Sequence, residues 1–231
     1  MVVAEALGRL DFRDPHTMAL AHSLAVPCKG VDHMDFSADG TYVIASCEFA
    51  GKVIKVDVAR QEVVGSLELR KGGMPQDVKL SPDGKIFYVA DMAAGGLFEV
   101  DGETLRVTGF LPTGKGTHGL YVSRDSKYLY AANRGEGSVS VVDLAGHSVV
   151  ATWRIPGGGS PDMGGLSADG ATLWPLRSLQ LRGVRLRYLE RTPARTREGR
   201  PAAPRLVLLS AARPLFPRPY GGVPLSTIGR C

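Results

Sequence analysis

Four positions in the first 174 residues carry polar side chains whose types suit the binding of a polar ligand. Each lies seven residues before the aspartate of a Ser-x-Asp-Gly tetrapeptide or a close variant of it, and they are Asp32, Gln76, His118 and Asp162. His33 and Asp77 follow one residue later in two of the four copies. Imidazole nitrogens and carboxylate oxygens can hold a divalent cation or bond a polar ligand. These six side chains therefore form a candidate binding site if the fold brings them together.

A second interpretation assigns the same six side chains to the framework, as solvated turns and as hydrogen bonds between neighbouring repeats, and we favour it. A metal site built on both histidines would require the two halves of a closed ring. The sequence contains no recognisable set of nucleophile, base and orienting group, and no phosphate-binding glycine loop or haem signature. We therefore predict no catalytic residue, no bound metal and no cofactor.

The elements that must position these residues follow from an internal repeat. The tetrapeptides begin at Ser37, Ser81, Ser123 and Ser167, at intervals of 44, 42 and 44 residues. Eighteen residues after each of the first three aspartates, a second aspartate ends an apolar run, at Asp57, Asp101 and Asp143. A further apolar run lies between these two anchors and another lies beyond them. Four runs of about five residues, rich in valine, isoleucine and aromatic residues, predict four short strands in each unit.

Four-stranded units that recur every 40 to 50 residues are typical of β-propeller blades. We predict an all-β fold of four-stranded antiparallel blades, with Asp-Gly forming type I′ hairpin turns. Three blades are full, at about 36–79, 80–121 and 122–166, and two are partial, at 1–35 and 167–174. In the first, segments 2–6, 12–14 and 19–26 supply the second, third and fourth strands. Because seven such blades need about 300 residues, we expect an incomplete ring; closure in four blades is the alternative.

The repeat resembles that of the YncE-like YVTN β-propeller proteins, over residues 10–174. The likeness rests on Ser-x-Asp-Gly, on a strand ending Tyr130-Ala131-Ala132-Asn133, and on the Val-x-Val-x-Asp pattern of 139–143. Similar proteins are usually seven-bladed, often exported or surface-associated, and mostly described as binding modules. The resemblance implies a non-enzymatic module that binds an unknown protein or a small polar ligand. The alternative is a propeller enzyme, a lactonase-like hydrolase or an oxidoreductase, with its site at the central channel.

The resemblance also suggests a calcium site and a disulfide. Calcium-dependent lactonase propellers would supply a convergent Glu/Asn/Asp set, for which Glu48, Asn133 and Asp162 are available, although no motif recommends them. Cys28 and Cys47 flank one hairpin and form a possible disulfide of the kind found in exported proteins. They lie at unequal distances from the Asp39-Gly40 turn, which argues against the pairing.

The net charge of +5 over 231 residues is the sum of two unlike segments. Residues 1–174 carry 16 Lys and Arg against 21 Asp and Glu, whereas residues 175–231 carry 12 Arg, no Lys and two Glu. The repeat is therefore acidic, and we expect no nucleic-acid partner. No apolar stretch is long enough to span a membrane, and the first residues do not form a signal peptide.

The Arg/Pro-rich segment 175–231 permits three interpretations: a disordered extension, a basic arm for phosphate-rich partners, or translation out of frame after Trp174. We favour the last, because the repeat stops in the middle of a predicted strand. Uncovered edges of the terminal blades also predict self-association.

Overall fold

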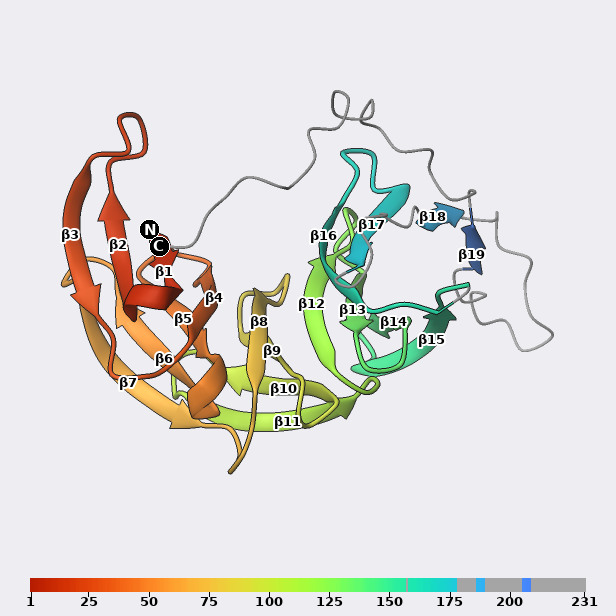
Figure 1. Cartoon of the computed structure of the whole chain (residues 1–231), viewed down its shortest axis with the longest axis horizontal. Coiled ribbons are helices and arrows are strands. Elements are labelled where there is room, and N and C mark those ends of the chain that lie inside the picture. Colours follow the sequence, from red (N-terminus) through yellow and green to blue (C-terminus); the bar gives the residue numbers. More distant parts are fainter. Residues whose placement is uncertain (157, 178–185, 190–204, 209–231) are drawn as a thin grey trace, which may run out of the picture.

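The chain folds into five antiparallel β-sheets that follow one another along an arc (Figure 1). The computed structural model describes residues 1–156, 158–177, 186–189 and 205–208, and side chains as far as Trp174. Within these residues the regular elements are strands and two short 3-10 turns, η1 (Glu5–Leu7) and η2 (Glu48–Ala50). This confirms the predicted all-β fold of propeller-like blades. No helix in this part of the chain is long and apolar enough to cross a membrane.

The three middle sheets contain four strands each, in sequence order from the inner to the outer side of the arc. The second sheet comprises β4 (Val31–Phe36), β5 (Tyr42–Cys47), β6 (Lys52–Asp57) and β7 (Glu62–Glu68). The third comprises β8 (Pro75–Leu80), β9 (Ile86–Asp91), β10 (Gly96–Asp101) and β11 (Arg106–Pro112). The fourth comprises β12 (Thr117–Val122), β13 (Tyr128–Asn133), β14 (Ser138–Asp143) and β15 (Ser148–Arg154). The first strands β4, β8 and β12 lie side by side.

The first and fifth sheets lie at the two ends of the arc. The first has three strands, β1 (Val2–Ala4), β2 (Arg9–Arg13) and β3 (Leu20–Ala25), which correspond to the second to fourth strands of the other sheets. The fifth has four, β16 (Pro161–Leu166), β17 (Thr172–Arg177), β18 (Leu186–Leu189) and β19 (Arg205–Leu208).

The fifth sheet extends beyond Trp174, where the sequence pattern predicts that the repeat stops. β17 runs on to Arg177, and β18 and β19 pair in order beside it. The segments Leu-Arg-Tyr-Leu and Arg-Leu-Val-Leu have the aliphatic and aromatic composition of strands, which accounts for this local structure. The rest of 178–231 lies outside the described residues, so the three interpretations of that segment stay open.

The repeated tetrapeptide forms the turn between the first and second strand of each blade. Ser37 Oγ donates to Asp39 Oδ1 over 2.7 Å and accepts the backbone N–H of Tyr42 over 3.1 Å. The same pair of hydrogen bonds occurs in the turns that begin at Ser81, Ser123 and Ser167. Gly40 has a φ of 72°, but Asp39 does not have a positive φ, so the prediction of type I′ turns is wrong. The side-chain bonds of Ser and Asp determine the turn here.

The second repeated aspartate also ends its strand with a side-chain bond. Asp57 Oδ1 accepts the backbone N–H of Arg60 over 2.8 Å, and Asp101 Oδ1 accepts that of Thr104 over the same distance. Asp14 does this for Thr17 over 2.7 Å, which shows that the first sheet has the same outer hairpin as the others. The repeat is thus a set of local hydrogen bonds that fixes where each strand ends.

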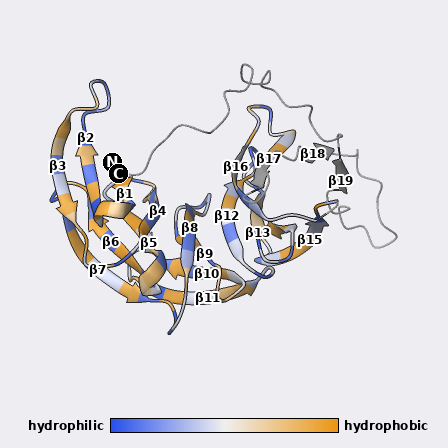
Figure 2. Cartoon of the chain, viewed as in Figure 1, coloured by the Kyte–Doolittle hydropathy of each residue, from blue (hydrophilic) through white to orange (hydrophobic). Residues whose placement is uncertain are grey.

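The apolar core lies between the sheets. Strand side chains are buried against the neighbouring blade, and the cluster between the second and third sheets includes Tyr42, Ile44, Phe87 and Val89. Comparable clusters lie at the other three junctions between blades. Figure 2 shows the apolar residues distributed along the strands of every sheet. Each blade therefore depends on its neighbours for burial, as in other repeat architectures.

Candidate functional site

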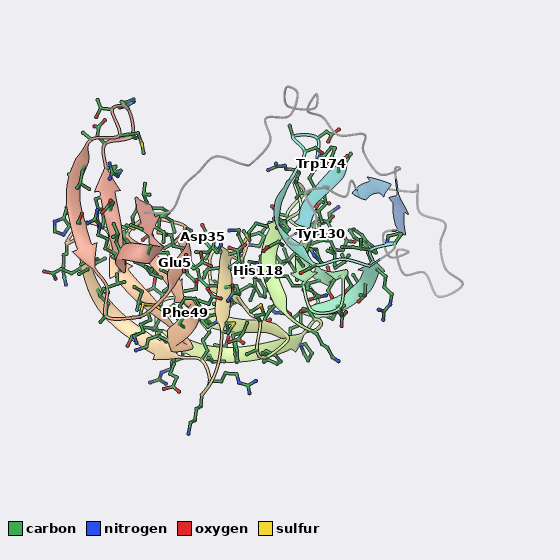
Figure 3. The ribbon with its side chains drawn as sticks, in the orientation of Figure 1. Glu5, Asp35, Phe49, His118, Tyr130 and Trp174 are labelled. Atoms are coloured by element: carbon green, nitrogen blue, oxygen red, sulfur yellow. A yellow bond between two sulfur atoms is a disulfide. The ribbon has the colours of Figure 1, made fainter. Side chains whose placement is uncertain are left out.

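The predicted binding residues lie at the start of the innermost strands. Their positions are equivalent, since they are the second residues of β4, β8, β12 and β16: Asp32, Gln76, His118 and Asp162. His33 and Asp77 are the third residues of β4 and β8. β4 packs beside β8, β8 beside β12, and β12 beside β16, so the fold brings all six to the same edge of the arc. In Figure 3 His118 lies on the inner side of the arc.

Asp77 connects two blades. Its side chain is fully buried; Oδ2 accepts the backbone N–H of Leu120 on β12 over 2.9 Å. Oδ1 accepts the N–H of Val78 over 2.9 Å and lies 3.1 Å from Lys79 Nζ. These bonds occupy both carboxylate oxygens. Asp77 thus has the framework role that the second interpretation assigns to it.

The side chain of Gln76 is also buried in the protein interior. It is 1% exposed, and its Nε2 donates to the carbonyl of Met74 over 3.3 Å. Asp35, which the sequence analysis did not single out, makes a second bond between blades by accepting the N–H of Leu80 over 2.8 Å. Nothing in its local sequence distinguishes it from an ordinary strand residue.

Asp32 and His33 form a partly exposed pair on β4. His33 Nε2 lies 3.4 Å from Asp32 Oδ1, and the two side chains are 31% and 23% exposed. The pKa of Asp32 is raised to about 6, first by burial and then by the negative charges of Glu5, Glu48 and Asp77, while His33 opposes the shift. The carboxylate of Asp32 is therefore destabilised by its surroundings and would be stabilised by a cation or a hydrogen-bond donor.

His118 and Asp162 form a second pair at the other end of this edge. His118 Nδ1 lies 3.2 Å from Asp162 Oδ1, but the contact lacks hydrogen-bond geometry, and this buried nitrogen has no hydrogen-bond partner among the described residues. Burial lowers the pKa of His118, although the charge of Asp162 acts in the opposite direction. Arg134 Nη2 lies 3.6 Å from the other oxygen of Asp162. A neutral imidazole thus adjoins a carboxylate held by a guanidinium.

The loops that follow the second strands supply charges that the sequence analysis missed. Glu5, Glu48, Met92 and Arg134 are the first residues of the four equivalent loops. The first two are acidic and the last is basic, so the electrostatic character of the edge changes along the arc. Aligning the repeat one residue beyond each second strand would have revealed this gradient.

Glu48, Asn133 and Asp162, the residues available for a calcium site like that of the lactonases, do not form such a site. Asn133 is fully buried, and its amide donates to Ser138 Oγ over 3.0 Å and to Ser140 Oγ over 2.9 Å. Glu48 raises the pKa of Asp32 on the second blade, whereas Asp162 faces His118 on the fourth. In the part of the chain that the structure describes, no three His, Cys, Asp or Glu side chains are grouped closely enough to hold a metal ion.

A disulfide joins the loop before β4 to the end of β5. Cys28 and Cys47 are bonded, with Cα atoms 5.9 Å apart. Their unequal distances from the turn are accommodated because the register shifts between β4 and β5 and Gly30 adopts a φ of 68°. The Gly30 carbonyl accepts the N–H of Glu48 over 2.7 Å, and a Cβ at Gly30 would lie 2.6 Å from the Phe49 ring. The disulfide thus connects the segment that precedes Asp32 to the residue that precedes Glu48.

No protein-family model matches the chain. A 6-phosphogluconolactonase of Serratia proteamaculans is 25% identical over 147 residues, which are 57% of this chain and 44% of that protein. Among solved structures, the Myceliophteria thermophila Cps50 (Swd1) β-propeller domain matches with a TM-score of 0.65 and 17% identity, over 82% of this chain and 62% of that one. The hydrazine synthase of Kuenenia stuttgartiensis matches with a TM-score of 0.62 and 22% identity, over 81% and 52%.

These likenesses and the five sheets define the class: the chain has a β-propeller fold. It spans about half of the length of the proteins it matches, from 44% to 62%.

Proposed function

We propose that the chain is a binding module of the β-propeller class that holds a small polar ligand at the inner edge of its blades. The proposed ligand contacts are Asp32, His33, His118 and Asp162. The observation that carries the proposal is His118, because its Nδ1 is buried without a hydrogen-bond partner among the described residues. Leaving such a nitrogen unsatisfied costs about 1–3 kcal/mol, and a ligand that reoriented the Asp162 carboxylate toward Nδ1 would remove that cost.

The chemistry of these four side chains indicates what the ligand must offer. Asp32 and Asp162 accept hydrogen bonds, and the lowered pKa of His118 keeps its ring neutral, so it can donate from one nitrogen and accept at the other. A molecule rich in hydroxyl or amine groups fits this set. Gln76 and Asp77 are excluded from the contact set, since internal bonds occupy them.

The repeat supports placing the chain near the YncE-like YVTN proteins, which are mostly described as binding modules. The acidic balance of residues 1–174 argues against a nucleic-acid partner. Self-association through the terminal blades stays a prediction, to be tested by size-exclusion chromatography.

A second candidate is hydrolysis of a sugar lactone, which the match to a 6-phosphogluconolactonase favours. In that reaction a water oxygen bonds to the lactone carbonyl carbon and its proton passes to His118. The ring C–O bond then breaks, and the proton passes to the released oxygen. Asp162 Oδ1, which lies 3.2 Å from Nδ1, would orient the imidazole by accepting a hydrogen bond from Nδ1 in the substrate complex, so that Nε2 takes the proton. His118 serves as ligand contact in the first candidate and as base in the second.

One experiment tests both candidates. A panel of polyols, amines and sugar lactones is screened by thermal shift, and each hit is measured by calorimetry and for lactone hydrolysis. A ligand at 100 times its Kd adds about 2.7 kcal/mol of stability, which gives a measurable shift. His118→Ala and the milder His118→Gln should weaken binding at least about tenfold, whereas His16→Ala, a change at an exposed hairpin histidine, should not.

The outcomes distinguish the candidates. Binding without turnover that is lost in both His118 variants supports the module. Turnover that disappears in these variants, with their fold intact by circular dichroism, assigns the lactonase activity instead. Binding that is unchanged in both His118 variants and in Asp32→Asn would place the ligand elsewhere and refute the proposed site.

A further inference from the structure

Two short turns on neighbouring blades have the same construction and lie at equivalent positions. η1 (Glu5–Leu7) follows β1, and η2 (Glu48–Ala50) follows β5; each begins with a glutamate and ends at a glycine. Since β1 and β5 are both second strands of their blades, the two turns occupy the same end of adjacent sheets. Figure 3 shows Glu5 and Phe49 at this end of the arc, on the first two sheets.

Each turn presents a large apolar side chain to solvent. Leu7 is 65% exposed and Phe49 is 64% exposed, the highest values among the large apolar residues that the structure describes. The Phe49 ring lies against Gly30, in the loop that the disulfide of Cys28 anchors. A ring that already contacts the backbone on one side has less freedom to lose when a partner covers the other side.

Each apolar side chain is accompanied by a carboxylate. The negative charges of Glu5 and Glu48 both raise the pKa of Asp32, so both glutamates lie near this carboxylate. Neither glutamate forms an ion pair within the described part of the chain. Each turn therefore combines an exposed apolar side chain with a glutamate, and neither the two glutamates nor Asp32 has a Lys or Arg ion-pair partner in the described part of the chain.

The feature is confined to the first two blades. In the third and fourth blades the equivalent loops read Met92-Ala93-Ala94 and Arg134-Gly135-Glu136, and they combine no exposed large apolar residue with a leading carboxylate. The framework does not require the pattern, since the third and fourth blades have loops of the same length that also end in a glycine of positive φ, Gly95 and Gly137. This contrast points to a role for the pattern other than folding.

We propose that Glu5, Leu7, Glu48 and Phe49 form a docking face for a peptide segment of a partner protein that carries Arg or Lys beside aliphatic or aromatic residues. The cationic groups pair with the two glutamates and Asp32, and the apolar side chains cover Leu7 and Phe49. Charge complementarity selects this occupant, because an acidic or purely apolar segment would leave the three carboxylates uncompensated. The face shares Asp32 with the ligand site proposed above, but its anchors Glu5, Leu7, Glu48 and Phe49 lie outside that site.

The test uses the full chain and a fluorescein-labelled peptide of alternating leucine and arginine separated by glycine, measured by fluorescence anisotropy. Phe49→Ala and the double change Glu5→Gln with Glu48→Gln should each weaken binding about tenfold, the loss expected for an interface anchor. Binding should also weaken as salt rises from 50 to 300 mM. A peptide with glutamate in place of arginine should not bind.

Matched variants serve as controls. Phe36→Ala removes an aromatic ring that is 40% exposed at the opposite end of β4, and Glu62→Gln with Glu68→Gln removes two exposed charges from β7. Both should bind the peptide as the unchanged chain does, as should His118→Ala. Thermal melts confirm that each variant is folded.

Three results would overturn the proposal. The first is equal affinity for the glutamate peptide; the second is a loss in the β7 double variant equal to that in the Glu5 and Glu48 variant. The third is salt-sensitive self-association of the chain, abolished by Phe49→Ala, because the occupant would then be a second copy. Loss of ligand binding in His118→Ala with peptide binding retained separates the two proposals.

Discussion

The two ends of each blade differ in how they are built. At one end, Ser, Asp and the backbone form the same turn four times, with the Ser37 and Asp39 arrangement repeated in the later blades. At the other end, the equivalent positions carry Asp32, Gln76, His118 and Asp162, and these side chains have different partners and different burial. The first end is uniform because its hydrogen bonds are local. The second end varies because its contacts cross from blade to blade.

Within one repeat, the turn positions therefore belong to the framework, whereas the inner-edge positions are the candidates for binding. A position that closes a local turn needs one chemistry in every copy. A position on the inner edge is free to change as long as buried groups are satisfied. Asp77 meets that condition with one hydrogen bond to β12 and others within β8, whereas His118 does not meet it among the described residues. The inner edge is therefore where the candidate site and the docking face are found.

The largest expected effect comes from breaking the bond between the third and fourth blades. Asp77→Ala should lower the free energy of unfolding by about 3–4 kcal/mol, because it leaves Lys79 and the N–H of Leu120 without their partner. Asp162→Ala, at a partly exposed position, should cost less, about 1 kcal/mol. Urea unfolding measures both. Equal losses would show that the inner edge is uniform and remove the distinction made above.

The disulfide should have the next largest effect. Its 19-residue loop predicts a loss of about 3 kcal/mol in the variant Cys28→Ser with Cys47→Ser. Dithiothreitol should lower the stability of the unchanged chain by a similar amount and leave the double variant unaffected. A stability that does not respond to reductant would contradict the role of this bond in anchoring the loop before β4.

Removing the turn serine should lower the stability of the chain by the same amount in every blade. Ser37→Ala, Ser81→Ala and Ser123→Ala each remove one donor and one acceptor at the turn, and each should cost about 1–2 kcal/mol. The three values should agree within about 0.5 kcal/mol. Values that differ widely among the blades would mean that tertiary contacts, rather than the local turn, set the requirement for serine.

The smallest effects concern the pH dependence of folding stability. The contributions of Asp32 at the inner edge and Asp39 at the turn should have opposite signs. The pKa of Asp32 is raised to about 6, so the folded chain binds its proton more tightly than the unfolded chain, and stability falls as pH rises from about 4 to 6. Asp32→Asn should therefore stabilise the chain by about 1 kcal/mol at pH 7.5 and have little effect at pH 4.

Asp39→Asn should do the opposite. The hydrogen bond from Ser37 lowers the pKa of Asp39, so this carboxylate contributes stability above the unfolded pKa of about 4 and loses it as pH falls. The variant should be less stable at neutral pH, and the difference should disappear in acid. Thermal melts from pH 3 to 8 compare the two variants, and effects of the same sign would contradict the assignment.

Much of the fold could be predicted from the sequence. The spacing of Ser-x-Asp-Gly and Val-x-Val-x-Asp predicts four strands per blade, and even the three-stranded first sheet was recognisable from Asp14. The turn type was not, because the Oγ of Ser37 competes with the backbone geometry that Asp-Gly alone would favour. The two short strands β18 and β19 were also missed, since they carry no trace of the repeat.

The candidate site was only partly accessible from the sequence. The repeat indicated that the polar side chains hold equivalent positions, but it could not tell that Asp77 and Gln76 are buried in the framework. Nor did it reveal that Arg134 reaches Asp162, or that Glu5 and Glu48 act on Asp32, because these contacts join residues of different strands or blades.

Each blade follows from its local sequence, because the hydrogen bonds that define it span a few residues and depend on residue type alone. Which inner-edge side chains find a hydrogen-bond partner depends instead on the contacts between blades. That outcome depends on packing β4, β8, β12 and β16 side by side, which sets the burial of each group and the distance to its partner. The desolvation of His118 and Asp32 arises from this packing, and it supports the proposed ligand site.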